Sequence, residues 1–261
     1  MIYLTGDCHG DFYRFTKRQR LKLPFLLGDN DYVIVCGDLG LLWVKDEEFA
    51  YNLEWLSRLP FTILWVQGNH ENYDLIAEYP MEMWHGGKVR HIVRDKIILL
   101  ERGQVFHVEG KNFFTFGGAS SHDVEGGVLD INSPTYAQEK KAARKSGLPY
   151  RIKGVSWWEQ ELPSPAEIQE ARKNLSNVGY CVDYVVTHCL PSSMQDLLTQ
   201  HPILSRRVRS SYKADILTDF FDELEKKLKY KQWYCGHYHV TFNLDDKHAI
   251  LYKDIVPLVG L

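Results

Sequence analysis

Five short apolar segments, each followed by residues that can bind a metal ion, most restrict how this 261-residue chain can fold. The segments hold three to five residues and are rich in β-branched and aromatic side chains. Continuous apolar runs of this length predict strands that are buried on both faces, as in the parallel sheets of α/β proteins. The predicted strands cover residues 2–5, 32–36, 62–66, 184–186 and 232–235.

Helical patterns follow several of these segments and predict an α/β alternation of strands with helices. The clearest is residues 46–58, where Asp46 can cap the N-terminus and Phe49, Leu53 and Leu56 share one face. The predicted helices cover residues 10–20, 46–58, 72–79, 191–199 and 213–228.

The middle of the chain has two further patterns. Residues 88–118 contain short strand-like segments with turn residues between them, which predicts an antiparallel meander in a second sheet. Residues 119–165 are less regular and rich in Gly, Ser, Pro and basic residues. We expect this stretch to be an insertion or lid within a single domain that spans residues 1–261.

Composition and charge exclude several classes of protein. Hydrophobic residues make up 44% and charged residues 25% of the chain, as in ordinary globular proteins. A net charge of -3 argues against coating nucleic acid by bulk electrostatics, although a local basic patch is compatible with it. No apolar run approaches the roughly 18 residues of a membrane span, and the first residues enter a strand pattern rather than a signal peptide.

The cysteines indicate a cellular compartment, and the lack of three catalytic motifs argues against three classes of protein. The chain has five cysteines and no CxxC pair, so we expect reduced thiols and a cytoplasmic location. Those near the polar motifs are predicted to be small buried packing residues. The chain lacks the GxSxG, GxxxxGK[ST] and HExxH motifs of serine hydrolases, P-loop proteins and zincins.

Potential metal ligands stand at the exit of every one of the five predicted strands. Four exits have a glycine just before the ligand, and glycine permits the sharp turn that such an exit requires. In open α/β sheets ligands gather beyond the carboxyl ends of the strands, so these side chains should meet at one edge. The set that predicts a metal site is Asp7, His9, Asp38, Asn69, His188, His237 and His239.

Seven candidate ligands are too many for one tetrahedral ion, and two ions that share a bridging carboxylate fit them better. Nitrogen and oxygen donors without thiolates suit manganese first, with iron, zinc or nickel as alternatives. Paired ions of this kind clamp the attacking and leaving oxygens of phosphate esters. Two divalent ions would also outweigh the two aspartates and attract phosphate, although the whole chain is acidic.

The ordered motifs resemble those of the calcineurin-like metallophosphoesterases. The resemblance rests on "GDCHG", "GD" at 37–38, "GNHE", "TH" at 187–188 and "GHYH", which together span residues 6–239. It implies a four-layer αββα sandwich of two mixed β-sheets flanked by helices. It further implies that Asp7, His9 and His239 hold one ion, while Asn69, His188 and His237 hold the other. Asp38 would bridge both ions, together with a hydroxide that attacks phosphorus. His70 would not bind metal; it would stabilise the transferring phosphoryl oxygens or protonate the leaving group.

Some positions depart from the family pattern. Leu41 stands where an acid often follows the second motif, and no arginine follows the second and third motifs. These differences argue against the serine/threonine protein phosphatase subfamily. The "HGG" at 85–87 imitates a motif of that subfamily, but it comes too soon after "GNHE", so His85 is predicted to be a loop residue.

Candidate substrate contacts lie in and near the predicted insertion. His122 and Asp123 follow a Gly-Gly turn, where they could form the turn or touch substrate. Trp157 and Trp158 could pack the core or the lid, or stack a base. Basic residues outnumber acidic ones between Tyr136 and Lys153, which suggests a mobile basic lid that draws in a polyanion. The lid residues taken as substrate contacts are Lys140, Lys141, Arg144 and Lys145.

Three functions are compatible with these features. The favoured one is a dinuclear metal phosphoesterase that hydrolyses a phosphate mono- or diester. The second is a nuclease or nucleotide phosphodiesterase of the same fold, which predicts a basic groove and a nucleotide or nucleic-acid substrate. The third is a scaffold without activity, which the retention of seven ligands and His70 disfavours. None of the three calls for a membrane partner.

Overall fold

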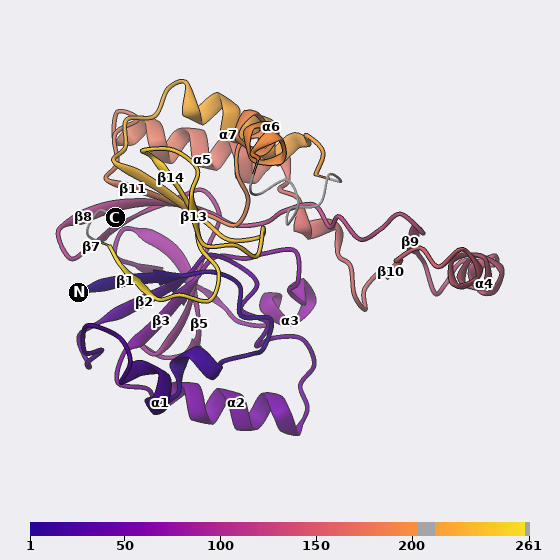
Figure 1. The fold of residues 1–261 in the computed structure, drawn as a ribbon, viewed down its shortest axis with the longest axis horizontal. Helices are drawn as coiled ribbons and strands as arrows, with labels where there is room; N and C mark the ends of the chain where they lie inside the picture. Colours follow the sequence, from indigo (N-terminus) through magenta and orange to yellow (C-terminus); the bar gives the residue numbers. More distant parts are fainter. Residues whose placement is uncertain (203–211, 259–261) are drawn as a thin grey trace.

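Two β-sheets packed face to face form the body of the protein, and helices cover both outer faces (Figure 1). The computed structural model describes residues 1–202 and 212–258. The helices α1 and α2 lie on one side, and α5, α6 and α7 lie on the other (Figure 1). This is the predicted four-layer αββα sandwich.

The first sheet has seven strands, of which β1, β2, β3 and β6 run parallel to one another. The strands at its two margins, β15 on one side and β5 and β4 on the other, run antiparallel to their neighbours. The order across the sheet is β15 (Val256–Pro257), β1 (Ile2–Thr5), β2 (Tyr32–Val35), β3 (Thr62–Trp65), β6 (Ile97–Leu100), β5 (Gly87–Val93) and β4 (Met81–Trp84).

The second sheet has six strands, and its four central strands are parallel. The order is β13 (Phe242–Asn243), β14 (His248–Ile250), β12 (Gln232–Cys235), β11 (Tyr184–Thr187), β8 (Lys111–Phe116) and β7 (Gln104–Val108).

The expectation that residues 88–118 form one meander in the second sheet is wrong for its first half. Strands β5 and β6 belong to the first sheet because β6 pairs in parallel with β3. Only β7 and β8 form the predicted antiparallel pair in the second sheet. Local alternation predicts strands, but it does not specify the sheet that they join.

Most of the predicted helices are present, and one of them is interrupted. Asp46 caps α2 by accepting a hydrogen bond from the Phe49 N–H at 2.8 Å, as predicted. The helix expected over residues 10–20 is split because Thr16 has extended backbone (φ -63°, ψ 149°). Apart from α4, the helices are η1 (Tyr13–Phe15), α1 (Lys17–Arg20), α2 (Glu47–Ser57), α3 (Tyr73–Ala77), η2 (Glu159–Glu161), α5 (Pro165–Asn177), α6 (Ser192–Gln200) and α7 (Ile216–Glu225).

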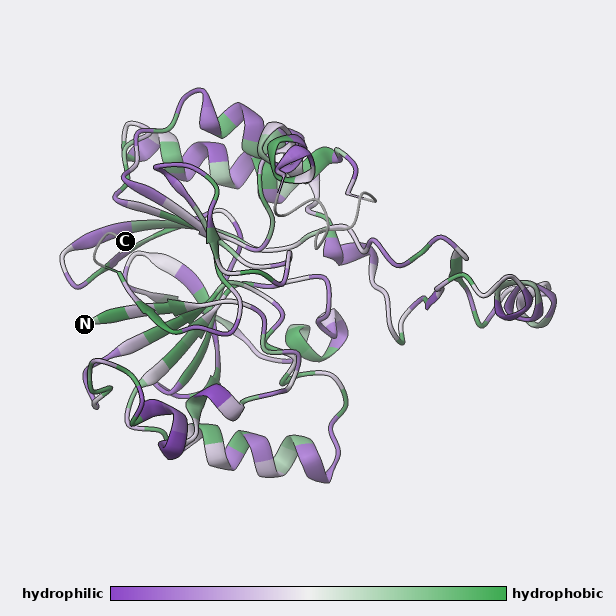
Figure 2. Cartoon of the chain, in the orientation of Figure 1, coloured by the Kyte–Doolittle hydropathy of each residue, from purple (hydrophilic) through white to green (hydrophobic). Residues whose placement is uncertain are grey.

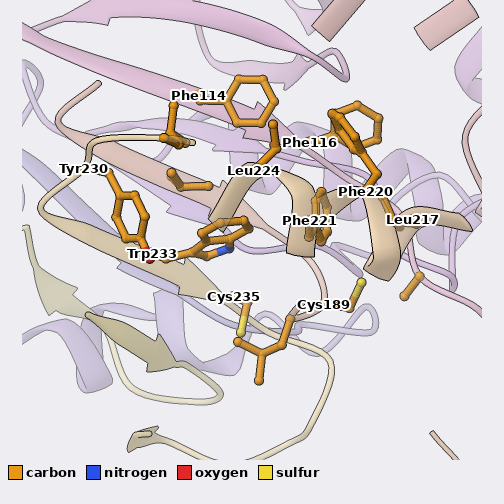
Figure 3. Close-up of a cluster of buried hydrophobic side chains, with 14 of the residues drawn as sticks. Phe114, Phe116, Cys189, Leu217, Phe220, Phe221, Leu224, Tyr230, Trp233 and Cys235 are labelled. Carbon is orange, nitrogen blue, oxygen red and sulfur yellow. The ribbon is translucent and has the colours of Figure 1, made fainter. Parts of the chain in front are cut away.

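Three buried layers of side chains hold the four layers of the sandwich together. Side chains alternate across each strand, so in β1 Leu4 faces the second sheet while Tyr3 faces the helices beneath the first. Strands of the first sheet are accordingly largely hydrophobic (Figure 2). On the outer face of the second sheet, Trp233 packs against Phe221 of α7 with ring centroids 5.6 Å apart (Figure 3).

Residues 119–165 leave the body as an arm that we call the insertion arm. Its two strands, β9 (Val128–Leu129) and β10 (Arg151–Ile152), pair in parallel, and between them lies α4 (Tyr136–Ser146). Figure 1 shows α4 at the tip of this arm, away from both sheets. Figure 2 shows that α4 is strongly hydrophilic, and Ala143 is its one buried residue.

Two further expectations concern the state of the cysteine thiols and the presence of membrane-spanning helices. All five cysteines are free, and four of them are buried as predicted: Cys8, Cys36, Cys189 and Cys235. Within residues 1–202 and 212–258, every helix is too short or too polar to cross a bilayer.

Phe221→Ala should destabilise the protein by about 3–5 kcal/mol, because it removes a fully buried ring from the layer between α7 and the second sheet. The free energy of unfolding in denaturant measures this loss. Tyr51→Ala is the matched control: its ring is 68% exposed, so its change should stay within about 0.5 kcal/mol. Equal effects of the two substitutions would contradict this account of the core.

Candidate metal centre

The polar residues that follow the five predicted strands converge beyond the carboxyl ends of β1, β2, β3, β11 and β12. The first three strands are parallel neighbours in one sheet, and the last two are parallel neighbours in the other. Side chains from both sheets therefore meet at the same edge of the sandwich. They include all seven predicted ligands: Asp7, His9, Asp38, Asn69, His188, His237 and His239.

One group of donors gathers around Asp7. Its Oδ2 lies 3.1 Å from Nε2 of His239 and 3.6 Å from Nε2 of His9, and those two imidazole nitrogens are 2.9 Å apart. The three residues form a cluster whose donor atoms all lie within 4.8 Å of one another. Such a spacing lets all three bind a single ion.

A second group gathers around His188. Its Nε2 lies 3.3 Å from Oδ2 of Asp38 and 3.2 Å from Oδ1 of Asn69. The ring of His237 is 4.9 Å from that of His188, centroid to centroid. The same Oδ2 of Asp38 is 3.7 Å from Nε2 of His9, so Asp38 faces both groups.

At this edge of the sandwich, four of the predicted ligands have a strained backbone conformation. His9, Asp38, His237 and His239 have φ between 49° and 69°, the left-handed region that residues with a Cβ rarely occupy. Strain of this kind persists where the surrounding structure holds it, and it clusters at functional sites.

Two glycines make room for the ligands. A Cβ on Gly37 would lie 2.0 Å from Nδ1 of His188, and a Cβ on Gly68 would lie 2.0 Å from Oδ1 of Asp38. Both distances are far below van der Waals contact, so any larger residue would displace a ligand. The glycines that mark these exits in the sequence are therefore required by the packing of the site.

The donor set and its burial fit divalent cations. Asp7 and Asp38 are each 1% exposed, and among the described residues their side chains meet imidazoles and backbone N–H groups rather than Lys or Arg. Burying two carboxylates is costly unless positive charge compensates them. Oxygen and nitrogen donors that converge without thiolates are those that borderline divalent metals prefer.

Contacts among the buried acidic and imidazole groups shift their pKa values. Burial opposes ionisation of Asp38, but the imidazoles of His188, His70 and His9 outweigh it and hold the pKa of Asp38 well below its ordinary value. Burial alone would lower the pKa of His188, yet the carboxylate of Asp38 raises it to about 9. An imidazole must be neutral to bind metal, so an ion at His188 would compete with a proton.

His70 lies at the mouth of this centre. Its ring is 4.8 Å from that of His9, and its backbone N–H donates to Oδ1 of Asp38 at 2.7 Å. Burial, with contributions from Arg151 and His9, lowers the pKa of His70 to about 4. His70 also falls within ligand distance of His9 and Asp38, so metal content must separate a ligand role from a role toward substrate.

Three residues outside the predicted site support it; of these, Arg151 was expected only as a member of the basic cluster between Tyr136 and Lys153. Glu71 Oε1 accepts a hydrogen bond from the Leu39 N–H at 3.0 Å, which fixes the turn after Asp38. Arg151 reaches His70 from the insertion arm, with Nη2 3.0 Å from Nε2 of the imidazole. The oxygen of Ser121 lies 3.5 Å from Nδ2 of Asn69. Glu71 stands inside the "GNHE" motif and Arg151 inside the basic cluster, whereas Ser121 had no sequence signal.

The predicted substrate contacts divide into two sets. The first set lies near the centre: the ring of His122 is 5.6 Å from that of His237, and Asp123 forms an ion pair with Arg151 at 2.8 Å. Trp158 is buried and donates from Nε1 to Asp74 at 2.8 Å, so its position matches the packing alternative.

The second set lies away from the ligands. Trp157 lines a cavity of about 880 Å³ beneath the insertion arm, to which none of the seven predicted ligands contributes. The basic residues of α4 are at the tip of the arm: Lys140, Lys141, Arg144 and Lys145. His85 lies in the turn between β4 and β5, and its Nδ1 is 3.0 Å from the carbonyl oxygen of His107.

Comparison with known proteins matches residues 1–241 to the family described as calcineurin-like phosphoesterase, a stretch that includes all five strand exits. A lariat debranching enzyme from Schizosaccharomyces pombe is 22% identical over an alignment of 261 positions, which covers 92% of this chain and 48% of that protein. The chain thus spans about half the length of this relative. A solved structure of a phosphopantetheinyl hydrolase from Mycobacterium tuberculosis is similar with a TM-score of 0.42 and 15% identity, over 96% of this chain and 87% of that chain.

Asp38→Asn should lower the metal content of the purified protein more than any other single ligand change, because Asp38 faces both groups of donors. Bound Mn²⁺ should also raise the midpoint of thermal unfolding in the unmodified protein, since a ligand of the native state stabilises it by about 2.7 kcal/mol at 100 times its Kd. Elemental analysis and thermal scans measure the two effects. Asp246→Asn, on the exposed surface, serves as the control. Equal metal content in Asp38→Asn and in the unmodified protein would show that Asp38 does not join the two groups.

Proposed function

We propose that this chain, which belongs to the calcineurin-like phosphoesterase family, is a metal-dependent phosphoester hydrolase and that two divalent ions serve its reaction on a phosphate mono- or diester. The observation that carries this proposal is the position of Asp38. Its Oδ2 lies 3.3 Å from Nε2 of His188 and 3.7 Å from Nε2 of His9, so one carboxylate faces both groups of nitrogen donors.

The proposed assignment follows the two groups. Asp7, His9 and His239 would hold one ion, and Asn69, His188 and His237 the other, with Asp38 shared. Divalent ions at this place supply a nucleophile from water at neutral pH and neutralise charge on the phosphate oxygens. We expect manganese first, with iron, zinc or nickel as alternatives, because the donor set contains no thiolate.

His70 would act on the substrate rather than on the ions. Its ring stands beside His9, and its backbone is tied to Asp38, so the imidazole is fixed next to the place where a phosphoryl group would lie. Two roles suit it: hydrogen-bond donation to the phosphoryl oxygens, or transfer of a proton to the leaving group.

A second candidate, action on polynucleotide phosphodiesters, is favoured by the insertion arm. Helix α4 carries four exposed or half-buried basic side chains and one acidic side chain, and it projects from the body. The relative named as a lariat debranching enzyme acts, by its name, on lariats. We propose that α4 contacts a polyanion that extends well beyond the metal centre; its place at the arm tip does not favour a lid directly over the ions.

We further propose that residues 1–261 form one domain with an insertion at about residues 119–165. Strand β15, near the C-terminal end of the described chain, pairs with β1, which supports a single unit. The five free thiols support our expectation of a reducing, cytoplasmic compartment.

The test of the proposed function is hydrolysis of an aryl phosphate by protein with and without metal. Chelation should abolish turnover and Mn²⁺ should restore it. His70→Ala should lower kcat by roughly 10²–10⁴-fold and keep the metal content of the unmodified protein. The loss should be larger for an alkyl phosphate if His70 protonates the leaving group.

His107→Ala is the matched control for this experiment, because that imidazole is exposed and pairs with Asn112 at 2.9 Å. Full turnover after verified removal of metal would refute a metal-dependent reaction at this centre. Loss of metal from His70→Ala would instead make His70 a ligand.

Neutralising Lys140, Lys141, Arg144 and Lys145 together should raise KM for a single-stranded oligonucleotide and flatten its dependence on salt. Such charges act through encounter and ground-state binding, and salt screens them over about 10 Å at 0.1 M. KM for an aryl phosphate should change far less, since that substrate is too small to span the arm. An unaltered KM and salt slope for every polyanion tested would make α4 an ordinary solvated helix.

A further inference from the structure

Arg151 is the one side chain of the insertion arm whose charged end directly meets the predicted catalytic histidine. It lies on β10, and Nη2 of its guanidinium is 3.0 Å from Nε2 and 3.3 Å from Nδ1 of His70. Its side chain is only 8% exposed. A guanidinium buried this deeply needs acceptors or negative charge that compensate the loss of its hydration.

The arm itself holds this guanidinium in a fixed orientation. Nε and Nη2 donate to the two carboxylate oxygens of Asp123 at 2.9 and 2.8 Å, and Nη1 donates to the carbonyl oxygen of Ser156 at 2.9 Å. Both partners belong to the insertion arm. The bidentate pair with Asp123 would be complete without His70, so it does not explain why Nη2 is also directed at the imidazole.

An anion bound beside both side chains, in front of the metal centre, would give the arrangement a function. The ring of His70 lies 4.8 Å from that of His9, so the guanidinium borders the space in front of the predicted ions. A guanidinium presents planar N–H donors that match the oxygens of phosphate, and such charge-assisted hydrogen bonds are among the strongest in proteins.

We propose that Arg151 is a substrate-binding residue, delivered to the metal centre by the insertion arm: when substrate binds, the Nη2 N–H that meets His70 donates instead to a non-bridging oxygen of the phosphoryl group, while the other Nη2 N–H stays on Asp123. Asp123 is then a positioning residue that holds the guanidinium ready and does not itself touch substrate. The inference rests on the proposed function, because it assumes that the phosphoryl group lies beside His70.

The experiment measures binding of inorganic phosphate to Mn²⁺-loaded protein by calorimetry, together with kcat and KM on an aryl phosphate. Arg151→Ala should weaken phosphate binding by roughly tenfold to a hundredfold, the usual worth of a hydrogen bond to a charged group. It should lower kcat/KM and leave the metal content unchanged. Arg151→Lys keeps the charge and should recover part of the affinity, and Asp123→Asn should give an intermediate loss.

Arg94→Ala is the matched control, because Arg94 also forms a bidentate pair, with Glu82 at 2.7 and 2.8 Å. Arg94 follows β5, which runs antiparallel to β6, so it lies at the edge of the sheet opposite the metal centre. This substitution should leave phosphate affinity unaltered.

The outcomes separate this inference from the proposed function. If the unmodified protein neither binds metal nor hydrolyses any phosphoester, the proposed function fails. If the protein is active but Arg151→Ala binds phosphate as tightly as the unmodified protein, then Arg151 only anchors the arm and the inference is overturned. Should Arg151→Ala fail to fold, an unaltered phosphate affinity in both Arg151→Lys and Asp123→Asn would overturn it equally.

Discussion

Two carboxylates buried at one edge of the sandwich are the constraint on which the rest of the site depends. Asp7 and Asp38 are almost fully buried, and among the described residues imidazoles and backbone N–H groups surround them. Bringing the two acids together requires positive charge, which metal ions supply. It also requires backbone turns tight enough to direct side chains from adjoining strands to the same point. The left-handed backbone of four predicted ligands and the close approach at Gly37 and Gly68 follow from this requirement.

Much of the fold and most of the site could be predicted from the sequence, because both depend on local patterns. Continuous apolar runs marked the central parallel strands, and polar residues at their exits marked the ligands, since parallel strands end at a common edge. The pairing of β6 with β3 could not be predicted in the same way. Residues 87–100 and 104–116 both look like hairpins locally, and only contacts between distant segments assign one hairpin to each sheet. The extended backbone of Thr16 likewise interrupts a helix that the apolar spacing favoured.

Arg151 shows where sequence reasoning reached its limit. In the sequence, Arg151 is one of several basic residues between Tyr136 and Lys153. Unlike the basic residues of α4, it is buried and forms an ion pair with Asp123. Its contact with His70 joins positions 81 apart through the arm, and no spacing in the sequence reports such a contact. The insertion arm thus has two distinct ends: a base that packs against the metal centre and a hydrophilic tip in solvent (Figures 1 and 2).

The contact between His9 and His239 has a consequence for how the protein is made. Its two nitrogens are 2.9 Å apart in space but 230 positions apart in the chain. Contacts of such long sequence separation form late, because much of the chain must be ordered before its ends can meet. A chain still emerging from the ribosome has the aspartates of β1 and β2 but not the histidines that follow β12. The set of predicted ligands is therefore complete only once residue 239 has been added, and a chain that stops short of residue 237 lacks its last two members.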